Sequence, residues 1–142
     1  MKKTTPIILV LSLCSVPLFS QVFSADSAFQ TVRTLSETIG PRPVGSAAER
    51  RALDWVASAF RRHGADTAFV QPFTRPDGAR GYNTTSGSAI GIFRGATDTA
   101  IVIGSHIDST PRTNPGALDN ASGTATMLDT RMRSWMGRRV NE

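Results

Sequence analysis

The stretch that decides the fold runs from Ile101 to Gly123 and reads I-V-I-G-S-H-I-D-S-T-P-R-T-N-P-G-A-L-D-N-A-S-G. Its first three residues, Ile101 to Ile103, form a β-branched apolar run that predicts a short strand. Such an uninterrupted run is typical of a strand that is covered on both faces in an α/β protein. The prolines and glycine of residues 111–116 predict a loop. A helix is predicted from Asp119, with Asp119 as its N-cap.

Three polar side chains lie where these predicted elements end or begin: His106 and Asp108 after the strand, and Asp119 before the helix. The H-x-D spacing places His106 and Asp108 on one side of an extended chain. The Asp108 carboxylate can accept the proton of one imidazole nitrogen, which leaves the other nitrogen free to bind a metal. Imidazole and carboxylate are common zinc ligands, so the pattern favours a metal site. Taken alone, however, a hydrogen-bonded histidine and a helix-capping aspartate are the simpler interpretations.

The motifs G-S-H-I-D-S-T and P-G-A-L-D-N-A-S-G, in this order and at this separation, resemble the zinc exopeptidases of the aminopeptidase Y and bacterial leucyl aminopeptidase type, peptidase family M28. The resemblance implies a three-layer α/β/α sandwich with a central mixed sheet. It implies that His106 binds one zinc ion, that Asp119 bridges two, and that Asp108 belongs to the catalytic set by orienting His106. It also implies a cis peptide bond between Asp119 and Asn120.

The stretch I-G-P-R-P-V-G-S, residues 39–46, is a second point of resemblance to the same family. Its two prolines fix a turn between two predicted helices, Asp26 to Ile39 and Ala47 to His63. Ser46 and Glu49 predict a capping box at the start of the second helix. The turn supports the family without supplying a catalytic residue of its own, and His63, at the end of the second helix, is not expected to be a ligand.

Two more strands are predicted between the second helix and Ile101, at residues 67–73 and 82–94, with a loop at 74–81. A turn at 95–99 suggests a hairpin between the second of these strands and the Ile101 strand. The α/β class is favoured by the uninterrupted apolar run at Ile101–Ile103.

The first 25 residues predict a secretory signal peptide, with a basic start, an interrupted apolar stretch and small residues at the expected cleavage point. A membrane anchor is one alternative, but the apolar run is short for a membrane span. A lipid-modified Cys14 is another, but Leu13 is large for the preceding position. Residues 26–142 are then the N-terminal portion of a zinc-exopeptidase domain. We expect export to the periplasm or the exterior, without stable membrane insertion after cleavage.

The net charge of +5 is concentrated at the two ends of the chain. Both lysines lie in the predicted signal peptide, and residues 131–142 hold four arginines and one glutamate. Residues 26–130 hold ten arginines and ten acidic residues. Because a nucleic-acid interface needs clustered basic residues, we expect no nucleic-acid partner. Cys14 is the single cysteine, so a mature chain would hold metal through His, Asp and Glu.

The resemblance implies a zinc-dependent exopeptidase, with two zinc ions in the complete site. By this resemblance the commonest activity is that of an aminopeptidase, which hydrolyses the N-terminal bond of a peptide or protein with metal-activated water. Carboxypeptidases and single-zinc glutaminyl cyclases share these motifs and remain open. Substrate preference and oligomeric state stay open too.

In that family a Glu-Glu pair, an Asp and a His follow the Asp119 helix, whereas here Glu142 is the only acidic residue after Asp129, and no histidine follows His106. Two ligands without a general base do not make a catalytic zinc site. We therefore expect a truncated N-terminal part, with an atypical tail from about residue 131, that is inactive alone. The alternatives are a catalytically inert, family-related interaction domain and an unrelated α/β domain.

Overall fold

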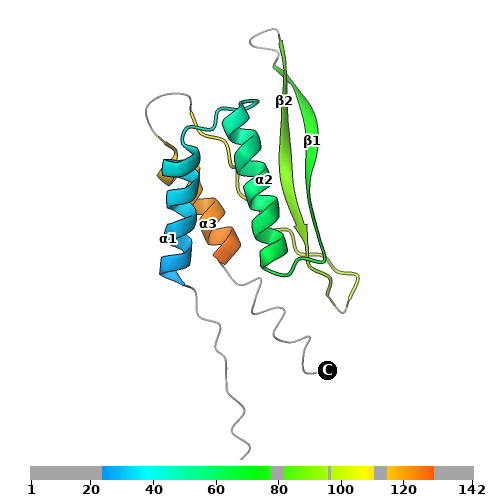
Figure 1. Cartoon of the computed structure of the whole chain (residues 1–142). Helices are drawn as coiled ribbons and strands as arrows, with labels where there is room; N and C mark the ends of the chain where they lie inside the picture. Colours follow the sequence, from blue (N-terminus) through cyan, green and yellow to red (C-terminus); the bar gives the residue numbers. More distant parts are fainter. Residues whose placement is uncertain (1–23, 78–81, 96, 111–114, 130–142) are drawn as a thin grey trace, which may run out of the picture.

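The computed structural model describes residues 24–77, 82–95, 97–110 and 115–129. The predicted signal peptide, residues 111–114 of the predicted loop and the tail from residue 130 lie outside these ranges. The elements in chain order are α1 (Ala25–Arg33), the π-helical segment η1 (Thr34–Ile39), α2 (Ala47–Arg62), β1 (Thr67–Asp77), β2 (Tyr82–Ile92), the short kinked segment η2 (Ala117–Ala121) and α3 (Ser122–Asp129). The β1–β2 hairpin lies on one side of α2, and α1 and α3 lie on the other (Figure 1). Among the described helices, none has the length and apolar character needed to cross a membrane.

Both predicted helices of the N-terminal half are confirmed. The first consists of α1 and η1, which run together as far as Ile39. Gly40 ends it with φ +82° and ψ −156°, a conformation that is essentially restricted to glycine. The second is α2, which ends at Arg62, one residue before the predicted end.

The predicted capping box of α2 is present with one change. The Ser46 hydroxyl accepts a hydrogen bond from the Glu49 amide at 3.1 Å, as predicted. The Glu49 carboxylate accepts from the Gly45 amide at 2.6 Å, instead of from the amide of Ser46. Its second oxygen accepts from the Ser86 hydroxyl at 2.6 Å, and Glu49 is buried. Glu49 thus joins the turn before α2 to strand β2.

The two strands between α2 and Ile101 form an antiparallel hairpin, in which Thr67 pairs with Ile92 and Asp77 pairs with Tyr82. Strand β1 continues to Asp77, so the prediction of a loop from residue 74 was wrong for its first four residues. The cause is the pairing itself, because residues 74–77 lie in register with residues 82–85 of β2.

The prediction of a buried strand at Ile101–Ile103 was wrong. No strand is assigned there, and β2 pairs with β1 rather than with this segment, so the predicted hairpin is absent from the described residues. The exposed fractions of Ile101, Val102 and Ile103 are 69%, 92% and 61%. β-Branched residues favour a strand only where a neighbouring strand supplies partners for the backbone and a surface for the side chains. The described part of the chain offers this segment neither.

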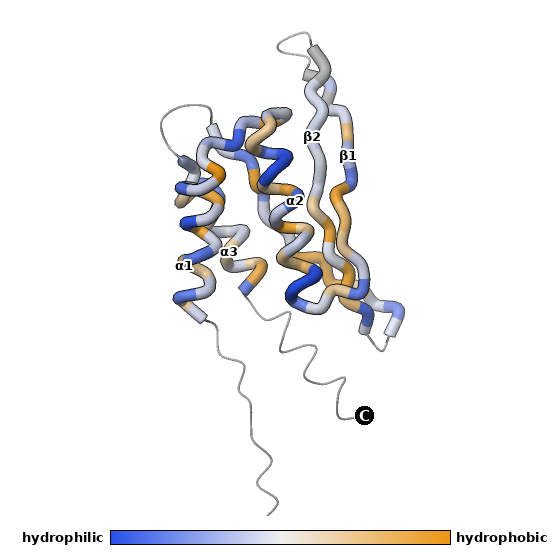
Figure 2. The backbone as a smooth tube through the Cα atoms, in the orientation of Figure 1, coloured by the Kyte–Doolittle hydropathy of each residue, from blue (hydrophilic) through white to orange (hydrophobic). Residues whose placement is uncertain are grey.

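The hydrophobic core lies on both sides of α2. One cluster consists of Val56, Ala59, Phe60 and Leu128, and the other of Leu35, Ala52 and Ala121. The apolar part of the hairpin is the half that lies beside the C-terminal end of α2 (Figure 2). Helices packed on strands are compatible with the α/β class, and the sheet of the described residues has two antiparallel strands.

Candidate metal centre

The H-I-D segment is held in place by its central residue. Ile107 packs against both core clusters. Because successive side chains of an extended chain point to opposite sides, the neighbours of Ile107 project away from the core. The side chains of His106 and Asp108 are accordingly 52% and 40% exposed.

The start of α3 differs from the prediction, because Asp119 is not its N-cap. Asp119 has non-helical angles, φ −124° and ψ 89°, and α3 begins at Ser122. The cap is supplied by Asn120, whose side-chain oxygen accepts from the Gly123 amide at 3.0 Å. The Asp119–Asn120 peptide bond is cis, as the resemblance implies. Since Asn120 satisfies the first turn of the helix, the Asp119 carboxylate is left to face His106.

The three predicted site residues lie together, with His106 between the two carboxylates. His106 Nδ1 lies 3.3 Å from an Asp108 carboxylate oxygen, and His106 Nε2 lies 3.0 Å from an Asp119 carboxylate oxygen. A neutral imidazole carries one N–H and can donate to only one of these oxygens. The second contact then sets a nitrogen lone pair against a carboxylate oxygen. It becomes favourable if the ring is protonated or if a cation lies between the two atoms.

The donor types at this contact match a zinc ion. Zinc binds nitrogen and carboxylate oxygen at ~2.0–2.2 Å, which places two donors of one ion roughly 3 Å apart. His106 Nε2 and Asp119 Oδ1 meet that requirement at 3.0 Å. The described residues contain no cluster of three or more His, Cys, Asp or Glu side chains able to hold a metal. His106 and Asp119 therefore fit as part of a zinc site, which needs at least one further protein ligand.

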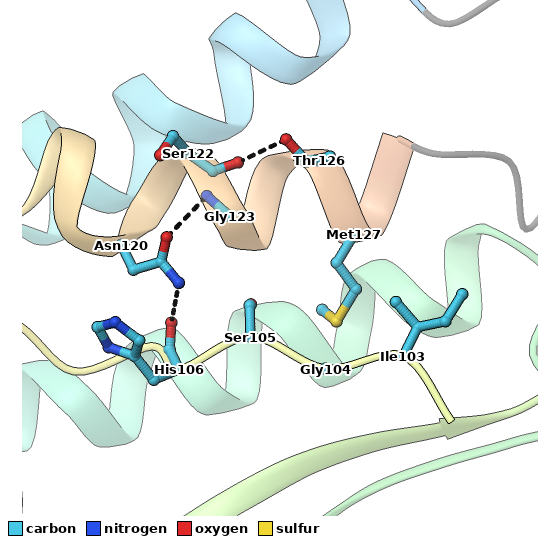
Figure 3. Close-up of a pocket in the computed structure, with 9 residues that line it drawn as sticks. All are labelled: Ile103, Gly104, Ser105, His106, Asn120, Ser122, Gly123, Thr126 and Met127. Carbon is cyan, nitrogen blue, oxygen red and sulfur yellow. Dashed lines mark hydrogen bonds between the residues drawn. The ribbon is translucent and has the colours of Figure 1, made fainter. Parts of the chain in front are cut away.

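Side chains of η2 and α3 contact the backbone that carries His106. The Thr124 hydroxyl donates to the His106 carbonyl at 3.4 Å and lies 3.0 Å from the Ser105 hydroxyl. The Asn120 amide nitrogen is 3.5 Å from the same carbonyl. An open hollow beside His106 has a polar wall from α3 and an apolar end formed by Ile103 and Met127 (Figure 3). Solvent or a substrate can therefore reach the imidazole from this side.

Removing the Asn120 cap is expected to destabilise α3. For Asn120→Ala we expect a loss of about 1 kcal/mol in the free energy of unfolding, measured by urea denaturation, because one first-turn amide loses its acceptor. Thr126→Ala is the matched control in the same helix: its exposed hydroxyl donates to the Ser122 carbonyl, and we expect a change within about 0.5 kcal/mol. Equal losses for both variants would contradict the capping role of Asn120.

Sequence reasoning missed Arg42, the arginine of the P-R-P turn. Arg42 is fully buried, and its guanidinium donates to the Ile107 carbonyl at 2.9 Å and to the Gly116 carbonyl at 3.1 Å. Burial lowers the pKa of Arg42 from its usual value, and the nearby Asp108 carboxylate opposes that shift. The sequence feature that could have identified it is the position of an arginine between two prolines in a short turn. Its partners, 65 and 74 residues away, leave no local pattern.

Comparison with known proteins places this segment in a family. The family model of peptidase family M28 matches residues 89–133, which include His106, Asp108 and Asp119. Residues 89–133 are therefore similar to peptidase family M28. The relationship predicted from the two motifs is thereby confirmed, and the M28 segment carries the whole of the described His106 site.

Two proteins similar to part of this chain come from Bacillus subtilis. Aminopeptidase YwaD of strain 168 is 40% identical over 68 residues, which are 48% of this chain and 15% of that protein. The crystal structure of BSAP, a zinc aminopeptidase, matches with 41% identity and a TM-score of 0.37, over 39% of this chain and 14% of the solved one. The chain thus spans about one seventh of the length of either relative.

Proposed function

We propose that this chain is the N-terminal part of an exported zinc exopeptidase, an aminopeptidase that hydrolyses the N-terminal bond of a peptide or protein. The observation that carries the proposal is the His106 ring with a carboxylate oxygen at each nitrogen, inside the M28 segment. The aminopeptidase and zinc-aminopeptidase relatives support it. The proposal includes the signal peptide of residues 1–25 and a three-layer α/β/α sandwich with a mixed sheet for the complete domain.

In this proposal His106 and Asp119 would hold zinc through an imidazole nitrogen and a carboxylate. Bound zinc supplies the Lewis acid that activates the attacking water. Asp108 accepts the Nδ1 proton of His106, which fixes the ring and leaves Nε2 as the metal-binding nitrogen. No third ligand joins His106 and Asp119 among the described residues, and no histidine follows His106 in the sequence. We propose that this incomplete ligand set is inactive alone. The missing groups are those that the family resemblance implies: a Glu-Glu pair, an Asp and a His.

Zinc binding tests the site directly. We expect the chain to bind zinc in isothermal titration, and we expect His106→Ala or Asp119→Ala to weaken the affinity by about tenfold or more, because each removes one donor of an incomplete set. His63→Ala is the matched control, since His63 is the C-cap residue of α2, and it should leave the affinity unchanged. A correctly folded wild-type chain that binds no zinc would instead favour the inert interaction domain.

Reading the coding DNA beyond codon 142 in all three frames tests the enzymatic part of the proposal. A frame that continues with the Glu-Glu pair, the Asp and the His should yield a longer protein. That protein should hydrolyse aminoacyl-p-nitroanilides and lose activity in a metal chelator. If no frame continues in this way, the peptidase proposal fails for this gene, whatever the zinc affinity of the chain.

A further inference from the structure

Arg42 lies at the centre of a network that joins three segments of the chain. Its five guanidinium contacts among the described residues are all to backbone carbonyl oxygens. These are the carbonyls of Leu35, Gly40, Ile107, Pro115 and Gly116. Arg42 is 0% exposed, so no solvent replaces these contacts. A planar cation with five N–H donors is suited to collecting several carbonyls at once, which a lysine ammonium cannot reproduce.

Two of these segments carry the candidate metal ligands. Ile107 is the residue between His106 and Asp108, and its carbonyl accepts from Arg42 Nε at 2.9 Å. Gly116 lies three residues before Asp119, and its carbonyl accepts from Arg42 Nη2 at 3.1 Å. One side chain therefore contacts the backbone on both sides of the His106–Asp119 contact.

The backbone of Arg42 adds two further bonds to the same region. The Arg42 amide donates to the Ser109 hydroxyl at 2.8 Å, and the Ser109 amide donates to the Arg42 carbonyl at 3.0 Å. Gly116, on the other side of the site, also accepts from the Ala121 amide at 2.9 Å. The amides of Ser109 and Ala121 thus report on the two segments that Arg42 holds together.

We propose that Arg42 is a positioning residue, which joins the His106–Asp108 segment to the loop before Asp119 so that His106 Nε2 and the Asp119 carboxylate face each other before any metal binds. The inference deepens the proposed function, because the two side chains brought together are the proposed zinc ligands. Supporting groups that orient ligands commonly affect metal affinity about 10–100-fold when they are replaced.

The test uses the full chain with Arg42→Gln and Arg42→Lys, and with Arg33→Gln as the matched control. Arg33 lies on α1 and makes an exposed ion pair with Glu37 at 3.1 Å, away from the carbonyl network. Hydrogen exchange is measured at the Ser109 and Ala121 amides, with Val56 in α2 as the internal reference. The second readout is the ring resonances of the two histidines, because the chain contains only His106 and His63.

For Arg42→Gln we expect exchange at Ser109 and Ala121 to rise by about tenfold or more while Val56 changes little, as in a local opening. The His106 ring resonances should shift and those of His63 should not. Arg42→Lys should give an intermediate effect, because the charge is retained without the planar fork. Arg33→Gln should resemble the wild type in both readouts.

Two results would overturn the proposal. If exchange rises equally at Ser109, Ala121 and Val56 in both Arg42 variants, the residue stabilises the whole fold and does not position the site. If neither variant changes exchange or the His106 resonances, the carbonyl network holds nothing in place. Both readouts are measured without metal. If the wild-type chain binds no zinc, the proposed function is contradicted, and hydrogen exchange still decides whether Arg42 positions the two segments.

Discussion

Replacing Gly116 with alanine is expected to lower the free energy of unfolding by at least about 2 kcal/mol and to weaken zinc binding. Gly116 has φ +67°, and an alanine held in this region costs about 1–2 kcal/mol. A Cβ atom there would also meet the Ser109 side chain and lie 2.8 Å from Arg42 Nη2. Relieving such a contact costs about 1–3 kcal/mol more, and it would displace the carbonyl that Arg42 binds.

Two other glycines separate these causes. Gly40 has φ +82° and ψ −156°, a conformation that is essentially restricted to glycine, but a Cβ there meets nothing within 4 Å. Gly40→Ala should therefore cost about 1–3 kcal/mol from the backbone alone. A Cβ on Gly104 likewise meets nothing within 4 Å, and Gly104→Ala should stay within about 0.5 kcal/mol. Urea denaturation measures all three. If Gly116→Ala loses no more free energy of unfolding than Gly40→Ala, the loop accommodates the new Cβ, and the Arg42–Gly116 contact is not rigid.

Replacing Phe60 with alanine is expected to destabilise the fold by about 3–5 kcal/mol, the cost of emptying a large aromatic site in a core. Phe60 is 3% exposed and packs edge-to-face on Phe93, with ring centroids 6.4 Å apart. It lies where α2 meets the hairpin, so its loss should loosen that contact first. Phe29→Ala is the matched control, because Phe29 is 62% exposed, and should change stability by less than about 0.5 kcal/mol.

A second substitution makes the Phe60 prediction sharper. A Cβ on Gly91 of β2 would lie 2.6 Å from Phe60 Cδ1, so Gly91→Ala alone should cost about 1–3 kcal/mol through overpacking. In the Phe60→Ala background the ring is gone, and the same substitution should cost less. The double-mutant cycle measures this coupling in thermal or urea unfolding. Simple additivity would contradict the close contact between α2 and β2.

Local sequence signals predicted the helices and the hairpin strands well. The apolar period of α2, the Ser46 cap and the stop at Gly40 each act within one or two helical turns, so a short window of sequence contains all the interacting partners. The strands of the hairpin were likewise recognisable. The extension of β1 to Asp77 was missed because it depends on pairing with β2.

The Ile101–Ile103 segment shows the limit of the same reasoning. Its composition is that of a buried strand, yet in the structure it is exposed and belongs to no strand. Strand propensity reflects packing against neighbours more than an intrinsic preference of the backbone, and the described residues provide no neighbour for this segment. Whether an apolar run of this kind forms a strand therefore depends on its tertiary neighbours rather than on the local sequence.

The sequence by itself predicted the α/β class, the resemblance of the segment around His106 to peptidase family M28, and the candidate residues His106, Asp108 and Asp119. Only the tertiary structure decided that Asn120 caps α3, which leaves the Asp119 carboxylate beside His106 Nε2. It also decided that Arg42 is buried against carbonyls up to 74 residues away. The physical reason is the range of the interactions: helical periods and caps join near neighbours, whereas ligand geometry depends on hydrogen bonds between segments that only folding brings together.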